Sequence, residues 1–246
     1  MRFRTITYNI HRAIGVDRRF RLERIIKILA HHKADIVLLQ EVDIGVPRSG
    51  KKNLAWELAQ ELGYPYSAVG LNVQLRRGYY GNATLSRFPI LRKRNIDLTI
   101  GTHKRRGCQH TTIQFSNGVT QKLLEVFNMH LGLSAQERSR QLGMLVQSVE
   151  FATLERHLPC IVGGDFNDWR SLLPPVFTDI LGFTNATRLK KSGEYDMPTY
   201  PSFSPAGSLD KIFFRGDLHK IKCRRCRLPV SRVASDHLPI IVDFEI

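Results

Sequence analysis

Short apolar runs, each followed by polar residues, recur along the whole chain. Phe3–Asn9 alternates apolar and polar residues, which is typical of a strand, and Leu22–Ala30 carries an apolar stripe at helical spacing. Ala34–Leu39 is apolar throughout and predicts a strand buried on both faces. The pattern predicts further helices at Leu54–Leu62 and Gln136–Leu154. It predicts further strands at Ala83–Ser86, Ile96–Thr99, Thr111–Phe115, Lys122–Asn128, Ser208–Phe214, Ile221–Leu228 and Leu238–Phe244.

One order of elements occurs twice. Both Phe3–Glu41 and Lys122–Asp165 begin with a strand that ends in Asn-x-His. A polar loop with Arg, a helix and an apolar strand follow, and an acidic residue comes after that last strand. We interpret them as two similar halves of one domain that spans 1–246, because the composition shows no linker. An Asn117-Gly118 pair that follows one of the predicted strands signals a hairpin. Two such halves would bring both sets of strand ends to one rim.

The stretch Ile161–Asp168, IVGGDFND, combines a buried strand with polar residues. In an extended segment Asp165 and Asn167 point to the same side and can offer two oxygens to a cation, a water or a phosphate. The two glycines would let a ligand approach the backbone closely. A simple turn after the strand is the alternative.

Other predicted strands also end in polar residues, so the candidate site grows to eight positions. These are Asn9, Glu41, His130, Asp165, Asn167, Asp210, Asp236 and His237. A carboxylate buried in a strand, such as Asp210, needs a partner, and histidine suits it because the carboxylate fixes its tautomer. Asp236 and His237 are adjacent and would point to opposite sides. The set is rich in oxygen and has no Cys, which favours Mg²⁺ or Mn²⁺ and hydrolysis by a metal-activated water.

The chain has 246 residues, with 37 basic and 22 acidic side chains, so its formal net charge is +15. Such an excess favours an anionic partner: nucleic acid, an anionic lipid surface or a phosphorylated substrate. No apolar run is long enough for a transmembrane segment, and no apolar signal region is seen at the start. We therefore expect a cytoplasmic protein, peripheral to a membrane if its partner is a phospholipid. Cys223 and Cys226 form a C-x-x-C pair, for which reduced thiols are expected rather than zinc.

Seven motifs follow one another along the chain: TYNIH with Asn9, LLQEVD with Glu41, YGNATLSRFPI with Asn82, NMHLG with His130, GGDFNDW with Asp165 and Asn167, SLDKIFF with Asp210, and SDHLPI with Asp236 and His237. In this order they resemble the endonuclease/exonuclease/phosphatase superfamily, relatives of DNase I, exonuclease III, neutral sphingomyelinases and inositol-polyphosphate 5-phosphatases. The segments GNATLSR, HLGL and GDFNDWR are most similar to small bacterial members of unassigned substrate. The resemblance implies a four-layered α/β sandwich: two mixed β-sheets packed face to face and flanked by helices, with the active site at the upper rim.

The resemblance also implies roles. Glu41 would be the principal metal ligand, with Asn9 beside it and Asp236 as a further metal-side carboxylate. Asp165 and Asn167 would orient the attacking water and contact the phosphate or a second metal. His130 would bind phosphate, where abasic-site endonucleases have Tyr. Asp210 would orient a catalytic histidine, and His237 would be the general base or stabilise the transition state. Whether one or two metals act, and which group is the base, stays open.

These roles describe a Mg²⁺- or Mn²⁺-dependent phosphodiester hydrolase. Basic and aromatic positions suggest substrate contacts at Asn82, Arg77, Arg106 and Trp169. They would suit a nucleic-acid backbone and its bases, which makes a nuclease, or an anionic phospholipid, which makes a phospholipase C-, sphingomyelinase- or lipid phosphatase-like enzyme. We favour nucleic acid. A non-catalytic binding protein on the same scaffold is disfavoured because no catalytic position of the family is missing.

Overall fold

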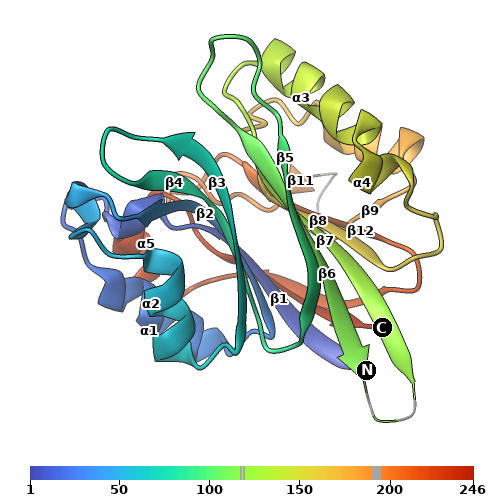
Figure 1. Ribbon diagram of the computed structural model, residues 1–246, viewed down its shortest axis with the longest axis horizontal. Helices are drawn as coiled ribbons and strands as arrows, with labels where there is room; N and C mark the ends of the chain where they lie inside the picture. Colours follow the sequence, from blue (N-terminus) through green and yellow to red (C-terminus); the bar gives the residue numbers. More distant parts are fainter. Residues whose placement is uncertain (117, 119, 190–194) are drawn as a thin grey trace.

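Two six-stranded sheets form the centre of the computed structural model, which describes residues 1–116, 118, 120–189 and 195–246 (Figure 1). The first sheet has the order β13 (His219–Arg225), β14 (Ile240–Glu245), β1 (Arg2–Asn9), β2 (Ile36–Ile44), β4 (Tyr79–Ser86) and β3 (Tyr66–Gln74). The second has the order β5 (Ile90–Asp97), β6 (Gly107–Ser116), β7 (Gln121–His130), β8 (Cys160–Asp165), β12 (Asp210–Arg215) and β9 (Thr184–Asn185). β10 (Arg188–Leu189) and β11 (Tyr195–Asp196) make a small separate ribbon.

Helices cover both outer sides of the paired sheets. α1 (Leu22–His32) and α2 (Leu54–Leu62) lie on one side, and α3 (Ala135–Gln147) and α4 (Val149–Ala152) lie on the other (Figure 1). One apolar cluster fills the space between the sheets, and two others lie beneath the helices. The expected four-layered sandwich is therefore confirmed. Shorter elements are η1 (His11–Ala13), η2 (Pro47–Ser49), the π-helical turn η3 (Val176–Ile180) and α5 (Ser231–Ala234).

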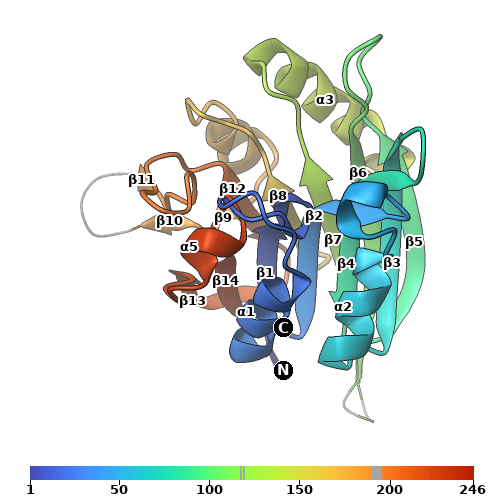
Figure 2. The same ribbon diagram turned by 90° about the vertical axis from the view of Figure 1, so that its left-hand side faces the viewer.

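The repeated order of elements corresponds to two parallel strand–helix–strand units. β1 pairs in parallel with β2 after α1, and β7 pairs in parallel with β8 after α3. Parallel strands need such a crossover, and their carboxyl ends then meet at one edge of the sheet. The turned view in Figure 2 shows β1 and β8 side by side in facing sheets, which brings both sets of strand ends together as expected.

Several predicted boundaries were wrong. β2 runs on through Glu41 to Ile44, because Glu41 adopts a φ of +59° within a bulge and lets the strand continue. The predicted helix Gln136–Leu154 is interrupted at Ser148, which is extended, so it becomes α3 and α4. β5 begins at Ile90, earlier than the predicted Ile96, because the exposed polar run Arg92–Asn95 between these positions carries no strand signal. β3 was missed because it is a partly exposed edge strand without strict alternation.

The C-x-x-C pair lies on two faces of the first sheet. Cys223 packs against the cluster between the sheets, whereas Cys226 belongs to the cluster under α1. All four cysteines are free thiols, as expected. His32, the last residue of α1, is buried, with Nε2 3.2 Å from Cys226 Sγ. Its burial lowers its pKa to about 4.

Two further sequence expectations concern the hairpin signal at Asn117-Gly118 and the lack of a transmembrane segment. Asn117 of the hairpin signal lies outside the described residues, although Ser116 of β6 is paired with Gln121 of β7. No helix among the described residues is long and apolar enough to cross a membrane.

Candidate active site

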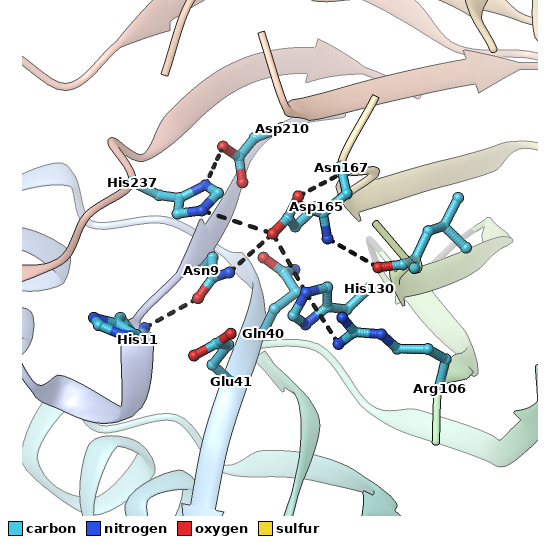
Figure 3. A network of polar contacts seen from close by, with 12 residues as sticks. Asn9, His11, Gln40, Glu41, Arg106, His130, Asp165, Asn167, Asp210 and His237 are labelled. Carbon is cyan, nitrogen blue, oxygen red and sulfur yellow. Dashed lines mark hydrogen bonds and ion pairs between the residues drawn. The ribbon is translucent and has the colours of Figure 1, made fainter. Parts of the chain in front are cut away.

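The polar strand ends meet around Asp165, the last residue of β8 (Figure 3). Register explains this, because Asp165 lies directly beside His130 of β7 and opposite Asp210 of β12. Asn9, at the end of β1, reaches Asp165 from the other sheet. Residues far apart in the chain therefore share one buried site.

Asp165 is held by bonds to both carboxylate oxygens. Asn9 Nδ2 donates to Oδ2 at 2.9 Å, and the backbone N–H of Asn167 donates to Oδ1 at 2.9 Å. His130 Nε2 and His237 Nε2 lie 3.5 and 3.7 Å from Oδ2. Burial, opposed in part by His237, raises the pKa of Asp165 to about 6. The carboxylate therefore stays mostly ionised at neutral pH while remaining basic enough to accept a proton.

His237 forms a chain of contacts with Asp210 and Thr199. Its Nδ1 lies 2.8 Å from Asp210 Oδ2, which also accepts a hydrogen bond of 2.6 Å from the Thr199 hydroxyl. Burial disfavours the charged imidazolium, but the carboxylates of Asp210 and Asp165 outweigh it and raise the pKa of His237 to about 10. Oxygen and nitrogen atoms of Asp165, Asp210 and His237 lie within 4.8 Å of one another, which is a spacing that could hold a metal ion.

His130 has the opposite electrostatic environment. Burial and the neighbouring positive charges of Arg106 and Lys104 hold its pKa well below the usual value. Its neutral Nε2 lies 3.2 Å from Arg106 Nη1, and a neutral ring nitrogen accepts that N–H. Arg106 is itself buried, and its Nε has no hydrogen-bond partner in the described part of the chain. Arg106 thus donates to the imidazole nitrogen that lies beside Asp165.

Asn167 is not in the extended geometry that the sequence suggested. β8 ends at Asp165, and Asn167 has a φ of +50°, so the same-side rule for strands does not apply. Its Nδ2 donates to the backbone oxygen of Leu131 at 2.9 Å, which ties the loop after β8 to the loop after β7. The turn that was the alternative interpretation is present, and it lies inside the candidate site.

The glycines of IVGG make room for neighbouring strands. A Cβ on Gly164, which has a φ of +145°, would lie 1.9 Å from the backbone oxygen of Met129, and one on Gly163 would lie 2.9 Å from Leu38 of the facing sheet. The expectation that these glycines open the backbone to a ligand was wrong. They allow β8 to pack closely against β7 and against the facing sheet.

Glu41 and Asp236 lie beside this network, near η1. Glu41 Oε2 lies 3.3 Å from Arg12 Nε, but both atoms lack a hydrogen-bond partner among the described residues. Asp236 Oδ1 lies 3.7 Å from His11 Nδ1, and the backbone N–H of His11 donates to Asn9 Oδ1 at 3.0 Å. Asp236 and the adjacent His237 contact different neighbours, as expected for side chains that point to opposite sides.

The four suggested substrate contacts differ in their surroundings. Asn82 is buried and donates to the backbone oxygens of Gly107 and Asn128, so it braces the two sheets. Arg77 is exposed in the loop between β3 and β4. Trp169 is 55% exposed, and its ring lies edge-on to Tyr200, 5.2 Å between centroids. These roles stay predictions.

Three neighbours of the site were missed from the sequence. Arg12 faces Glu41, Thr199 bonds Asp210, and the ring of Tyr200 lies 5.1 Å from that of His237. Thr199 and Tyr200 belong to a proline-rich stretch, and no periodicity marks them. Arg12 directly follows the Asn-x-His motif, which was the only available signal.

Comparisons with known proteins agree with this geometry. A family model for the endonuclease/exonuclease/phosphatase family matches residues 6–237. The uncharacterized protein YbhP of Escherichia coli K12 is 34% identical over 254 aligned positions, covering 99% of this chain and 96% of YbhP.

Solved structures share the fold at low identity. An endonuclease/exonuclease/phosphatase from Beutenbergia cavernae has a TM-score of 0.77 at 19% identity, covering 100% of this chain and 72% of that one. Another from Bacteroides vulgatus has a TM-score of 0.76 at 21% identity, covering 100% and 99%. This chain therefore belongs to the endonuclease/exonuclease/phosphatase family, whose members are hydrolases that act on phosphoester bonds.

Proposed function

We propose that this protein is a phosphodiester hydrolase that depends on Mg²⁺ or Mn²⁺ and cleaves nucleic acid with a water positioned by Asp165. The observation that carries this proposal is the meeting of Asn9, His130 and His237 around one Asp165 oxygen, at 2.9, 3.5 and 3.7 Å. Polar groups aimed at one buried point supply the positioning and charge stabilisation on which phosphoryl transfer depends.

The proton chemistry follows from the two pKa shifts. Asp165 is ionised above about pH 6 and can take a proton from the attacking water. His237 is protonated below about pH 10, so its imidazolium stabilises the negative charge that develops on the phosphoryl oxygens. Asp210 accepts the Nδ1–H and fixes the ring, so that Nε2 faces Asp165. This assignment makes Asp165 the base and leaves His237 as the charged donor.

Arg106, His130 and Asn167 would bind the phosphate rather than transfer protons. A neutral His130 cannot serve as an acid at neutral pH, but the Arg106 guanidinium lies beside it, and its Nε has no hydrogen-bond partner among the described residues. Asn167 keeps its position through its bond to Leu131. These groups would hold the non-bridging oxygens near Asp165.

The residues beside Glu41 fit a hard divalent cation. Glu41 Oε2 is buried without a hydrogen-bond partner among the described residues, and Asn9 and Asp236 offer further oxygens. Asp165, Asp210 and His237 fit less well, because metal binding through Nδ1 would break the bond between His237 and Asp210. When bound, the cation would polarise a phosphoryl oxygen as a Lewis acid. In this proposal Glu41, Asn9 and Asp236 would hold it.

Nucleic acid is the preferred substrate because the chain has a formal net charge of +15 and aromatic rings border the site. Trp169 exposes its indole next to Tyr200, which in turn lies against His237. An exposed aromatic ring next to a phosphate-binding site is suited to stack a base.

Replacing Asp165 or His237 by Ala should abolish hydrolysis, because each removes a group that the reaction requires. The measurement is plasmid nicking with Mg²⁺ or Mn²⁺, with EDTA added to remove the metal, alongside release of headgroups from phospholipid. Asp217→Asn is the matched control, since Asp217 is an exposed carboxylate in a surface ion pair with Lys122. Turnover near the wild-type level in Asp165→Ala, or full activity in EDTA, would refute the proposal.

A further inference from the structure

We propose that a groove along the edge strand β13 is a second phosphate-binding site, which holds the backbone of a nucleic-acid strand away from the bond that is cut. The substrate class rests on the function proposed above. The groove encloses about 930 Å³ between the end of α1, β13 and the segment at Met197–Pro198. Figure 2 shows β13 at the edge of the first sheet, close to α1 and below β10 and β11.

Positive charge in this groove exceeds negative charge. Five cationic side chains line it: Arg4, Lys222, Arg224, Arg225 and Arg227. The carboxylate of Asp243 carries one negative charge and accepts hydrogen bonds from two of them, Arg4 Nε at 2.5 Å and Arg224 Nη1 at 2.6 Å. In the described part of the chain, no carboxylate forms an ion pair with the remaining three cations, two arginines and one lysine.

Arg225 is held in place although the neighbouring positive charges repel it. Its Nη1 donates to the backbone oxygen of Pro198 at 2.5 Å, and the side chain is partly buried. Burial and the charges of Arg227 and Arg232 lower its pKa. A bound anion would relieve this repulsion, and a guanidinium presents the fork of N–H donors that matches phosphate oxygens.

The pattern KCRRCR could have a simpler explanation. Cationic residues on edge strands prevent unwanted pairing with other chains, and for that purpose exposed lysines are enough. Here the cations occupy both faces of the strand, because Arg224 pairs in register with Ile241 of the cluster under α1 and Arg225 with Ile240 of the cluster between the sheets. A groove with charged walls on both sides of a strand goes beyond that protective role.

A short segment connects the groove to the active site. Pro198 accepts the bond from Arg225, and the next residue, Thr199, bonds Asp210. Consecutive Cα atoms are about 3.8 Å apart, so the two sites share this wall. Tyr200 follows Thr199, and its ring packs edge-on against the ring of Trp169. A strand that leaves the active site across these rings would come to the arginines of β13.

The concave shape favours a nucleic-acid chain over a membrane. An extended backbone can enter a groove and place successive phosphates against its walls, whereas a bilayer offers its headgroups to a broad, open surface. The apolar side chains of Leu189 and Met197 in the same groove would pack against sugars and bases.

The test is the salt dependence of binding, measured without turnover. Fluorescence anisotropy of a labelled single-stranded oligonucleotide, in EDTA, gives the affinity between 50 and 200 mM salt. The double variant Lys222→Gln/Arg227→Gln removes two exposed cations that line the groove. Loss of two phosphate contacts should reduce the slope of log K against log salt by about 1.4, or 0.7 for each contact. Its control is Arg92→Gln/Lys93→Gln, which removes two exposed cations from β5 at an edge of the other sheet.

The outcomes separate this inference from the proposed function. An equal change of slope in both double variants, or wild-type binding to phosphatidylserine vesicles but not to the oligonucleotide, would overturn it. A change confined to the β13 variant supports it. If that change is seen but the wild-type protein with Mg²⁺ cleaves no nucleic acid, the groove stands and the proposed nuclease activity fails.

Discussion

At the residue scale, the proposed reaction depends on two neighbouring groups whose pKa values are shifted so that both are charged at neutral pH. Burial raises the pKa of Asp165 to about 6, which still leaves it ionised at pH 7. Burial acts against the charge on His237, but Asp210 and Asp165 outweigh it and raise its pKa to about 10. An ionised base and a protonated donor therefore coexist between these two values, 3.7 Å apart.

The first prediction is a bell-shaped pH profile whose alkaline limb moves to lower pH in Asp210→Asn. In the wild type, kcat/KM should rise as pH increases through about 6, where Asp165 ionises, and fall as it increases through about 10, where His237 loses its proton. Asp210→Asn removes a charge that raises the pKa of His237, so the alkaline limb should move to lower pH. An alkaline limb that does not move in this variant would contradict the role given to Asp210.

At the scale of elements, β8 positions the site because it lies between β7 and β12 and faces β1. Gly164 has a φ of +145° and lies so close to Met129 of β7 that no side chain fits. The close contact of β7 and β8 puts His130 and Asp165 side by side in register. A change in this packing should therefore disturb the site as well as the fold.

The second prediction concerns Gly164→Ala. Overpacking against a backbone oxygen, together with the unfavourable φ, should lower the free energy of unfolding by about 3 kcal/mol, measured by urea denaturation. Gly143→Ala is the control, because Gly143 lies in α3 with no atom within 4 Å of a new Cβ. It should raise the free energy of unfolding by about 0.5–1 kcal/mol. Equal effects of the two substitutions would show that β7 and β8 tolerate a wider spacing.

At the scale of the whole molecule, the packing of the two sheets sets the position of the candidate site, and the net charge sets the electric field around it. The two sheets pack face to face through one apolar cluster, and the candidate site lies where strands from both sheets end. The formal net charge of +15 creates a field that attracts polyanions over a longer range than any single contact. That the whole of 1–246 acts as one domain stays a prediction.

The third prediction follows from this field. Between 50 and 200 mM salt, kcat/KM for a nucleic-acid substrate should fall roughly 100-fold if four phosphates are contacted, because counterions are released on binding. A small phosphodiester such as bis(p-nitrophenyl) phosphate has one charge and should change little over the same range. Parallel losses for both substrates would mean that salt acts on the active site and not on long-range attraction.

Much of the site could be predicted because its residues end strands. Apolar runs followed by polar groups located Asn9, His130 and Asp165, whereas Asp210 was placed within a strand and His237 before one. The structure brings all five together. The repeated order of elements also predicted two parallel units whose strand ends meet. Local pattern is enough here, because burial of a strand's apolar residues determines where the strand ends and leaves its polar terminus at the rim.

The sequence by itself thus determined the two units and the polar strand ends, and its resemblance to the family predicted the sandwich. Only the tertiary structure decided what each group faces: Glu41 faces Arg12, Thr199 bonds Asp210, and the glycines accommodate Met129 and Leu38. The physical reason is that register and close packing between distant strands depend on three-dimensional contacts, which no local period encodes. The charge states of the site follow from the same contacts, since burial and neighbouring charges set the pKa values.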